Sequence, residues 1–200
     1  MSKLPAHQEH PGEVLCYRFA DWISPFFKRL NFTPNGITTL SNVGAAVALY
    51  GAYTKNRTLF LAGYVAKYIF DCTDGLYARK YGMTSGTGDL YDHISDLAFM
   101  VLLLWVLWTT FRFTAAADPY RGYLIAFYGL MVFASWIHMG CQEVLYARTS
   151  GKPSSATLSW YQQACPNPDS YVRFTRWIGS SFAVVTMGIV LILTVLEWTR

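Results

Sequence analysis

The sequence is poor in charge: only 14% of its 200 residues are Asp, Glu, Lys or Arg, whereas 53% are hydrophobic and 17% aromatic. A typical soluble domain carries about 25% charged residues. The mean hydropathy of +0.23 is also high for a soluble chain. The shortage of charge excludes an ordinary soluble domain and indicates a small polytopic membrane protein.

No basic stripe is present, although the net charge is +4. The Lys and Arg residues are scattered at the ends of apolar segments, where they act as anchors for headgroups and topology. This distribution argues against nucleic-acid binding.

Closely spaced cysteine pairs are also missing. Cys16, Cys72, Cys141 and Cys165 lie far apart, with no CxxC pair. This spacing argues against a zinc site or a redox motif. We expect buried or free thiols.

The N-terminal segment, residues 1–32, is polar at first and does not resemble a cleaved signal peptide. Within it, an amphipathic interfacial helix is predicted over about residues 13–29. Its apolar residues fall at i, i+3, i+4 and i+7: Phe19, Trp22, Ile23 and Phe26. Pro25 is expected to bend or end this helix.

Five membrane spans are predicted in residues 33–200, at about 36–53, 58–77, 89–111, 120–147 and 173–198. The stretch from Thr33 to Asn35 is a helix start signal. Residues 149–170 have the Pro, Gly and Ser content of a loop. The expected fold is therefore an all-α transmembrane bundle.

Charge counting predicts the orientation of the spans. With the N-terminus inside, ten Lys and Arg residues near span ends are cytoplasmic and five are outside. This excess favours a cytoplasmic N-terminus. The turn between the second and third spans then also faces the cytoplasm, in either a bacterial inner membrane or a eukaryotic endomembrane.

The strongest functional signal is a group of aspartates around that turn. Asp71 and Asp74 share one face of the second span, and Asp92 and Asp96 share one face of the third. In an antiparallel hairpin, Asp71 should lie level with Asp96, and Asp74 with Asp92. Carboxylates at bilayer depth need a cation to offset their repulsion, and Mg²⁺ or Mn²⁺ suits oxygen ligands.

Other residues beside these aspartates fit a phosphate ligand. Gly75 and Ala78 leave room for a close approach to the helix, and Arg79 adds a fixed positive charge. Glycines of this kind also serve close helix packing. Lys67, one turn before Asp71, is suited either to a structural ion pair or to a substrate contact.

Together these residues read Asp-x2-Asp-Gly-x2-Ala-Arg-x8-Gly-x3-Asp-x3-Asp, from Asp71 through Gly88 to Asp96. This pattern resembles the signature of the CDP-alcohol phosphotransferase (CDP-alcohol phosphatidyltransferase) family. The stretch Thr33 to Thr38 resembles the family's segment before its first span. The similarity is good over about residues 13–112, and the family's six spans make five to six the expected number.

The resemblance implies transfer of a phosphatidyl group from a CDP-linked lipid donor to a small alcohol, with release of CMP. It also implies a metal held by the four aspartates, among which Asp96 would deprotonate the acceptor hydroxyl. The donor would be bordered by five further residues: Asn35, Gly75, Ala78, Arg79 and Gly88. The same resemblance implies a homodimer in contact with membrane lipids.

Two alternatives remain open. One is an aminoalcohol phosphotransferase that uses CDP-choline or CDP-ethanolamine with diacylglycerol, a branch faintly suggested by Tyr91-Asp92-His93. The other is a divalent-cation channel or transporter that uses the same acidic cluster. The second leaves Gly75, Ala78 and Arg79 unexplained.

Overall fold

A computed structural model describes residues 3–151, 155, 159–165 and 167–198. Over these residues the chain is helical, with one isolated bridge between Phe113 and Leu196. The all-α prediction is therefore confirmed. The chain divides into two compact units, residues 16–118 with 192–200 and residues 2–15 with 119–191.

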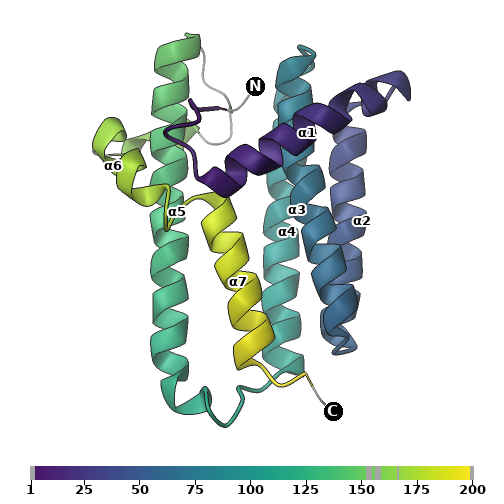
Figure 1. Ribbon diagram of the computed structural model, residues 1–200, viewed down its shortest axis with the longest axis vertical. Coiled ribbons are helices and arrows are strands. Elements are labelled where there is room, and N and C mark those ends of the chain that lie inside the picture. The colour runs from purple at the N-terminus through teal and green to yellow at the C-terminus, as the bar shows by residue number, and fades with distance from the viewer. Residues whose placement is uncertain (1–2, 152–154, 156–158, 166, 199–200) are drawn as a thin grey trace. The chain divides into compact units, whose positions relative to one another are not determined.

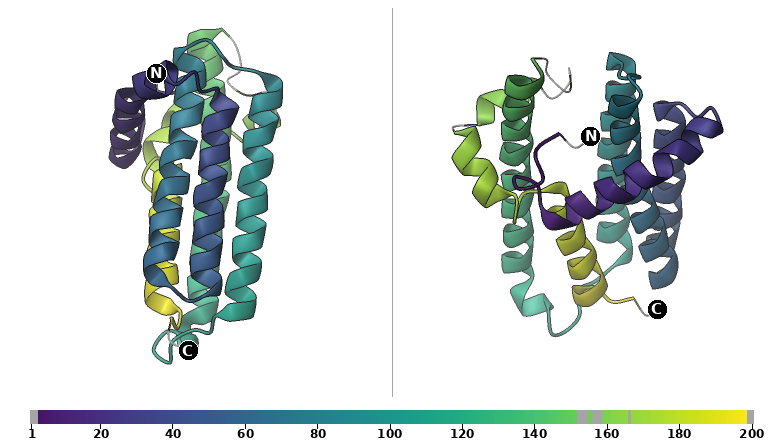
Figure 2. Two further views of the ribbon diagram at one scale, coloured as in Figure 1. Left: turned by 90° about the vertical axis from the view of Figure 1, so that its right-hand side faces the viewer. Right: turned by 45° about the horizontal axis from the view of Figure 1, so that its top comes forward.

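The first unit is built on helices α2 (Pro34–Tyr53), α3 (Arg57–Lys80) and α4 (Gly86–Thr110), which run side by side. Helix α2 packs against both α3 and α4 (Figures 1 and 2). Each of the three helices has a side-chain N-cap, in which Thr33, Asn56 and Ser85 accept a backbone N–H. The loop of residues 81–85 makes α3 and α4 antiparallel, as the sequence predicted.

Helices α2 and α3 meet backbone to backbone at glycines. A Cβ atom on Gly44 would lie 2.7 Å from the backbone nitrogen of Lys67. Gly51 and Gly63 likewise lie against the backbone of the facing helix, at Phe60 and at Ala48. Because no side chain separates the helices here, short polar groups on α2 can reach α3.

Helix α1 (Pro11–Arg29) is amphipathic and continues through Pro25 to Arg29. On one side Phe27 is buried in a cluster with Ile37 and Tyr77, and Ile23 packs against that cluster. On another side Phe19, Trp22 and Phe26 are exposed. The exposed aromatic face is compatible with the predicted interfacial position, which stays a prediction.

The far end of the first unit is closed by the C-terminal stretch. The Trp198 ring lies 5.3 Å from the Phe60 ring and 4.7 Å from the Phe111 ring, between centroids. The Thr114 amide donates to the Val195 carbonyl in the same region. These contacts hold the start of α3 and the end of α4 together.

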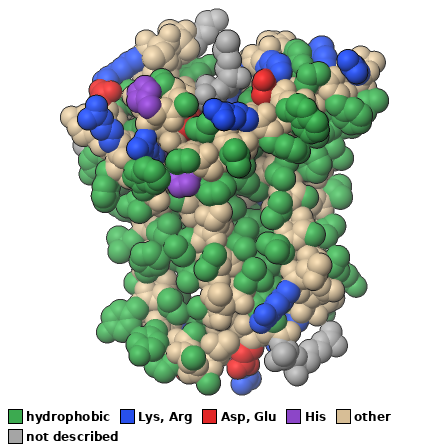
Figure 3. Space-filling model, viewed as in Figure 1, with side chains coloured by type: hydrophobic (Ala, Val, Ile, Leu, Met, Phe, Trp, Pro, Cys, Tyr) green, Lys and Arg blue, Asp and Glu red, His purple; other side chains and the backbone are tan. Residues whose placement is uncertain are grey.

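In the part of the chain that the structure describes, two helical stretches are long and apolar enough to cross a membrane, Gly86–Thr110 and Asp118–Ser150. A shorter apolar helix, α7 (Ser181–Val195), follows. Figure 3 shows hydrophobic side chains along the helices of the face it draws, with Lys and Arg mainly near helix ends. The number of spans stays a prediction.

In the second unit, α5 (Arg121–Ser150) carries the 3-10 segment η2 (Ser159–Ala164) and the short helix α6 (Pro168–Thr175) along its side (Figure 1). Cys141 and Cys165 form a disulfide that ties the loop after α5 to that helix. The expectation of free thiols was therefore wrong for this pair. It holds for Cys16 and Cys72.

The predicted last span, residues 173–198, was also wrong in its beginning. Helix α6 ends at Thr175, and α7 begins only at Ser181. Between them, the Ser180 hydroxyl accepts the Ala183 amide and caps the new helix. Gly179, whose added Cβ would lie 2.7 Å from the Ala134 carbonyl carbon, allows this turn to pack closely on α5.

A buried polar cluster joins the N-terminal segment to α5. The Glu9 carboxylate accepts the Leu4 amide at 3.1 Å and the Gln142 side-chain amide at 3.5 Å. Lys3 forms an ion pair of 2.9 Å with Glu143. Burial and the neighbouring charge of Glu13 raise the pKa of Glu9 to about 8.

This raised pKa predicts how stability depends on pH. Between about pH 4.5 and pH 8 the unfolded chain loses the Glu9 proton while the folded chain keeps it, so rising pH favours unfolding. We expect Glu9→Gln to reduce the fall in melting temperature of the detergent-purified protein between pH 5 and pH 8. Glu197→Gln, at an exposed position, is the control. A Glu9→Gln variant with the wild-type pH dependence would contradict this account.

Candidate metal and phosphate site

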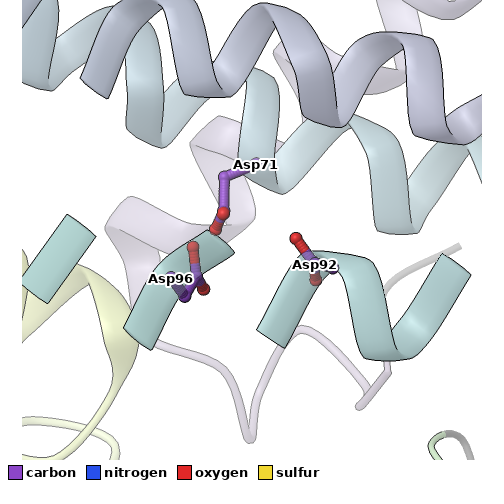
Figure 4. A group of neighbouring side chains, drawn as sticks. All are labelled: Asp71, Asp92 and Asp96. Atoms are coloured by element: carbon purple, nitrogen blue, oxygen red, sulfur yellow. The ribbon is translucent and has the colours of Figure 1, made fainter. Parts of the chain in front are cut away.

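Three of the predicted aspartates meet in the first unit. One carboxylate oxygen from each of Asp71, Asp92 and Asp96 lies within 4.8 Å of the other two. Asp71 comes from α3, and the other two come from one face of α4, one turn apart. Figure 4 shows the three carboxylates turned toward one another. All three are partly exposed, so a ligand from outside can reach them.

The Lys67 ammonium lies against this cluster. Its Nζ is 2.8 Å from Asp71 Oδ1 and 2.5 Å from Asp96 Oδ1. The Lys67 ammonium therefore neutralises part of the negative charge that Asp71 on α3 and Asp96 on α4 bring to the site. Of the two roles considered for Lys67, the structure contains the ion pair. The shared contact also puts Asp71 level with Asp96, as the mirror spacing predicted.

Asp74 is placed differently from the other three. It is 3% exposed, and the Thr38 hydroxyl donates to its Oδ2 at 2.6 Å. Its oxygens do not belong to the group formed by Asp71, Asp92 and Asp96. Asp92 and Asp71 nevertheless interact electrostatically with Asp74, which therefore lies beside the cluster. Thr38 was not predicted, since a hydroxyl on an apolar helix carries no periodic signal.

The residues expected to border the donor form two local contacts. A Cβ on Gly75 would lie 3.2 Å from Nη1 of Arg79, so the guanidinium folds over the bare backbone at Gly75. A Cβ on Gly88 would lie 2.9 Å from Oδ1 of Asn35. The chain therefore brings Asn35 to the start of α4. Ala78 is partly buried on the same helix as Arg79.

The carboxylates fit a divalent cation. Oxygens bound to one Mg²⁺ ion are about 3.0 Å apart at adjacent positions and about 4.2 Å apart at opposite ones, since each bond is about 2.1 Å. The three oxygens lie within 4.8 Å of one another, so the set is close to the size of such a ligand shell. Small side-chain rotations would suffice for one ion, and bridging carboxylates would suit two. Hard oxygen donors favour Mg²⁺ or Mn²⁺ over softer metals.

The Lys67 contact leads to a prediction for the metal-free protein. Lys67→Met removes the cation shared by Asp71 and Asp96 and leaves their repulsion uncompensated. We expect the melting temperature in EDTA to fall by about 5 °C. Added Mg²⁺ or Mn²⁺ should raise it by more than in the wild type.

Lys80→Met is the matched control, because Lys80 forms a more exposed pair with Asp21. Such surface pairs contribute about 0–1 kcal/mol. A Lys67→Met variant as stable as the wild type in EDTA would show that Lys67 does not compensate the cluster.

Comparison with known proteins identified a family. The sequence model of the family described as CDP-alcohol phosphatidyltransferase matches residues 31–196. That range covers the whole of α2, α3 and α4, including every aspartate of the cluster. No curated protein and no solved structure matched.

Proposed function

Because this chain belongs to the CDP-alcohol phosphatidyltransferase family, a transferase family for phosphate-containing groups, we propose that it moves a phosphatidyl group from CDP-diacylglycerol to a small polar alcohol. CMP is the other product. The family is membrane-integral, which suits a substrate with two acyl chains. The proposal includes a cytoplasmic active site and a homodimer.

The observation that carries the proposal is the meeting of Asp71, Asp92 and Asp96 at the junction of α3 and α4. Three carboxylates from two helices would repel one another in a medium of low dielectric constant. Lys67 offsets only part of this charge. A site that gathers them is therefore suited to Mg²⁺ or Mn²⁺, which in turn suits a pyrophosphate donor.

In the proposed reaction the acceptor hydroxyl oxygen bonds to the phosphorus that carries diacylglycerol. The bond from that phosphorus to the CMP oxygen breaks, and CMP leaves with its electron pair. Asp96 accepts the hydroxyl proton as general base. The ion, when bound, neutralises the pyrophosphate and the leaving group.

The other residues act by binding and orientation. Asp71, Asp74 and Asp92, together with Asp96, would hold the ion. Asp74 is oriented by the Thr38 hydroxyl at 2.6 Å. The donor would lie along the contact between Gly75 and Arg79, where the guanidinium can turn from the bare backbone to a phosphate oxygen. Ala78, Gly88 and Asn35 would border the same donor.

The direct test is CMP release by the purified protein. We expect release with CDP-diacylglycerol, Mg²⁺ or Mn²⁺ and one member of a panel of small polar alcohols, and none in EDTA. Release only from CDP-choline or CDP-ethanolamine with diacylglycerol would indicate the aminoalcohol reaction instead. No release with any donor, together with Mn²⁺ flux into proteoliposomes, would indicate a cation transporter and overturn the proposal.

A second prediction concerns Asp92. Asp92→Asn removes one charge from the metal cluster and keeps the side-chain volume. We expect CMP release to fall at least about 100-fold, because the loss of one ligand charge weakens both the binding of the ion and the stabilisation of the leaving group. The melting temperature in EDTA should not fall. Asp169→Asn, at an exposed carboxylate paired with Arg148, is the control. A fully active Asp92→Asn variant would remove Asp92 from the proposed metal site.

A further inference from the structure

Helix α2 holds α4 through a short chain of polar side chains beside the acidic cluster. The Asn42 amide nitrogen lies 3.0 Å from the Tyr91 hydroxyl and 3.1 Å from the Ser95 hydroxyl. The Tyr91 hydroxyl is also 3.2 Å from the Thr39 hydroxyl. Both α4 residues are therefore bonded to a single side chain of α2.

The hydrogens of this chain can be assigned. Thr39 donates its hydroxyl hydrogen to the Asn35 carbonyl at 2.8 Å. The Tyr91 hydroxyl must then donate to Thr39, since Thr39 has no second hydrogen. Tyr91 is left to accept from Asn42. The two hydrogens of the Asn42 amide are thus donated to Tyr91 and Ser95. From Asn42 each donor is followed by the next, through the Tyr91 and Thr39 hydroxyls, to the backbone carbonyl of Asn35 on α2.

The two residues held by Asn42 directly precede two of the proposed metal ligands. Tyr91 comes before Asp92, and Ser95 comes before Asp96. Successive residues of an α-helix are rotated by about 100°. Fixing residues 91 and 95 against α2 therefore turns residues 92 and 96 away from α2. In the structure that direction leads to Asp71 on α3.

Apolar packing does not fix α4 at this level. The buried residues of α4, a helix that is described along its whole length, are Phe99, Leu103 and Val106, all after Asp96. Around the carboxylates, Leu90, Ile94 and Leu97 are exposed. The hydrogen bonds of Asn42 therefore fix the rotation of α4 from the side of α2, while the ion pair of Lys67 with Asp96 joins α4 to α3.

We propose that Asn42 is a positioning residue that sets the rotation of α4 through Tyr91 and Ser95, and so aims Asp92 and Asp96 at the metal site. The inference rests on the function proposed above, because it concerns the same ion. It goes beyond the aspartate pattern, in which α2 has no part. Both hydrogens of the Asn42 amide go to Tyr91 and Ser95, so Asn42 acts on the carboxylates through α4.

The test measures Mn²⁺ binding by electron paramagnetic resonance of the free ion, alongside CMP release. Asn42→Leu has a similar volume but makes neither hydrogen bond. We expect its Mn²⁺ dissociation constant to rise about tenfold, in the range seen when partners that orient metal ligands are lost. CMP release should fall at low Mn²⁺ and recover at saturating Mn²⁺, a pattern that mere loss of folded protein would not give.

Two kinds of variant serve as references. Val43→Leu changes the neighbouring exposed residue and should bind Mn²⁺ as the wild type does. Asn42→Gln keeps both donor hydrogens and should restore part of the affinity. Tyr91→Phe and Ser95→Ala remove one bond each, and each should weaken binding by less than Asn42→Leu. These single changes decide the question if Asn42→Leu fails to fold.

The outcomes separate this inference from the function on which it rests. A wild type that binds Mn²⁺ and releases CMP, with an Asn42→Leu variant of unchanged Mn²⁺ affinity, would overturn the role of Asn42 alone. If Asn42→Leu does not fold, unchanged affinity in both Tyr91→Phe and Ser95→Ala would do the same. A wild type that neither binds Mn²⁺ nor releases CMP would overturn the proposed function, and the role of Asn42 with it.

Discussion

The close contact between α2 and α3 is the constraint on which the candidate site depends. Gly44 lets the two backbones approach so closely that a Cβ atom on this residue would lie 2.7 Å from the backbone nitrogen of Lys67. At that separation a side chain as short as Ser41 reaches the Lys67 carbonyl, and Thr38 reaches Asp74. A larger residue at Gly44 would push α2 and α3 apart and leave the buried Asp74 carboxylate without the Thr38 hydroxyl.

The arrangement of the aspartates could be predicted because helical geometry fixes it. Residues three or four apart share a face, and a short turn makes two helices antiparallel. These two rules place Asp71 level with Asp96, where the structure joins both to Lys67. The roles of Thr38 and Asn42 could not be predicted, because they depend on which face of α2 meets the other helices. An apolar helix with scattered hydroxyl groups does not reveal that face.

The errors in the last third of the chain have a different cause. Residues 176–180, between α6 and α7, include Trp177 and Ile178 and contain no proline, so a continuous helix could be drawn through them. The available signal was local: Gly179 followed by Ser180, a turn residue before a helix cap. The disulfide joins residues separated by 24 positions. Sequence spacing alone does not bring two such thiols together, whereas the η2 segment packed along α5 does.

Helix α2 carries no Asp, Glu, Lys or Arg, yet its Thr38 hydroxyl bonds to the Asp74 carboxylate of α3. In water, a carboxylate and an ammonium are stabilised by mobile dipoles that reorient around them. At Asp74 the Thr38 hydroxyl stands in a fixed position instead, while Ser41 and Asn42 bond to neutral groups of α3 and α4. The Thr38 hydroxyl thus takes the place of a solvating water molecule. Because its dipole is already oriented, it needs no reorganisation when charge moves at the neighbouring carboxylates.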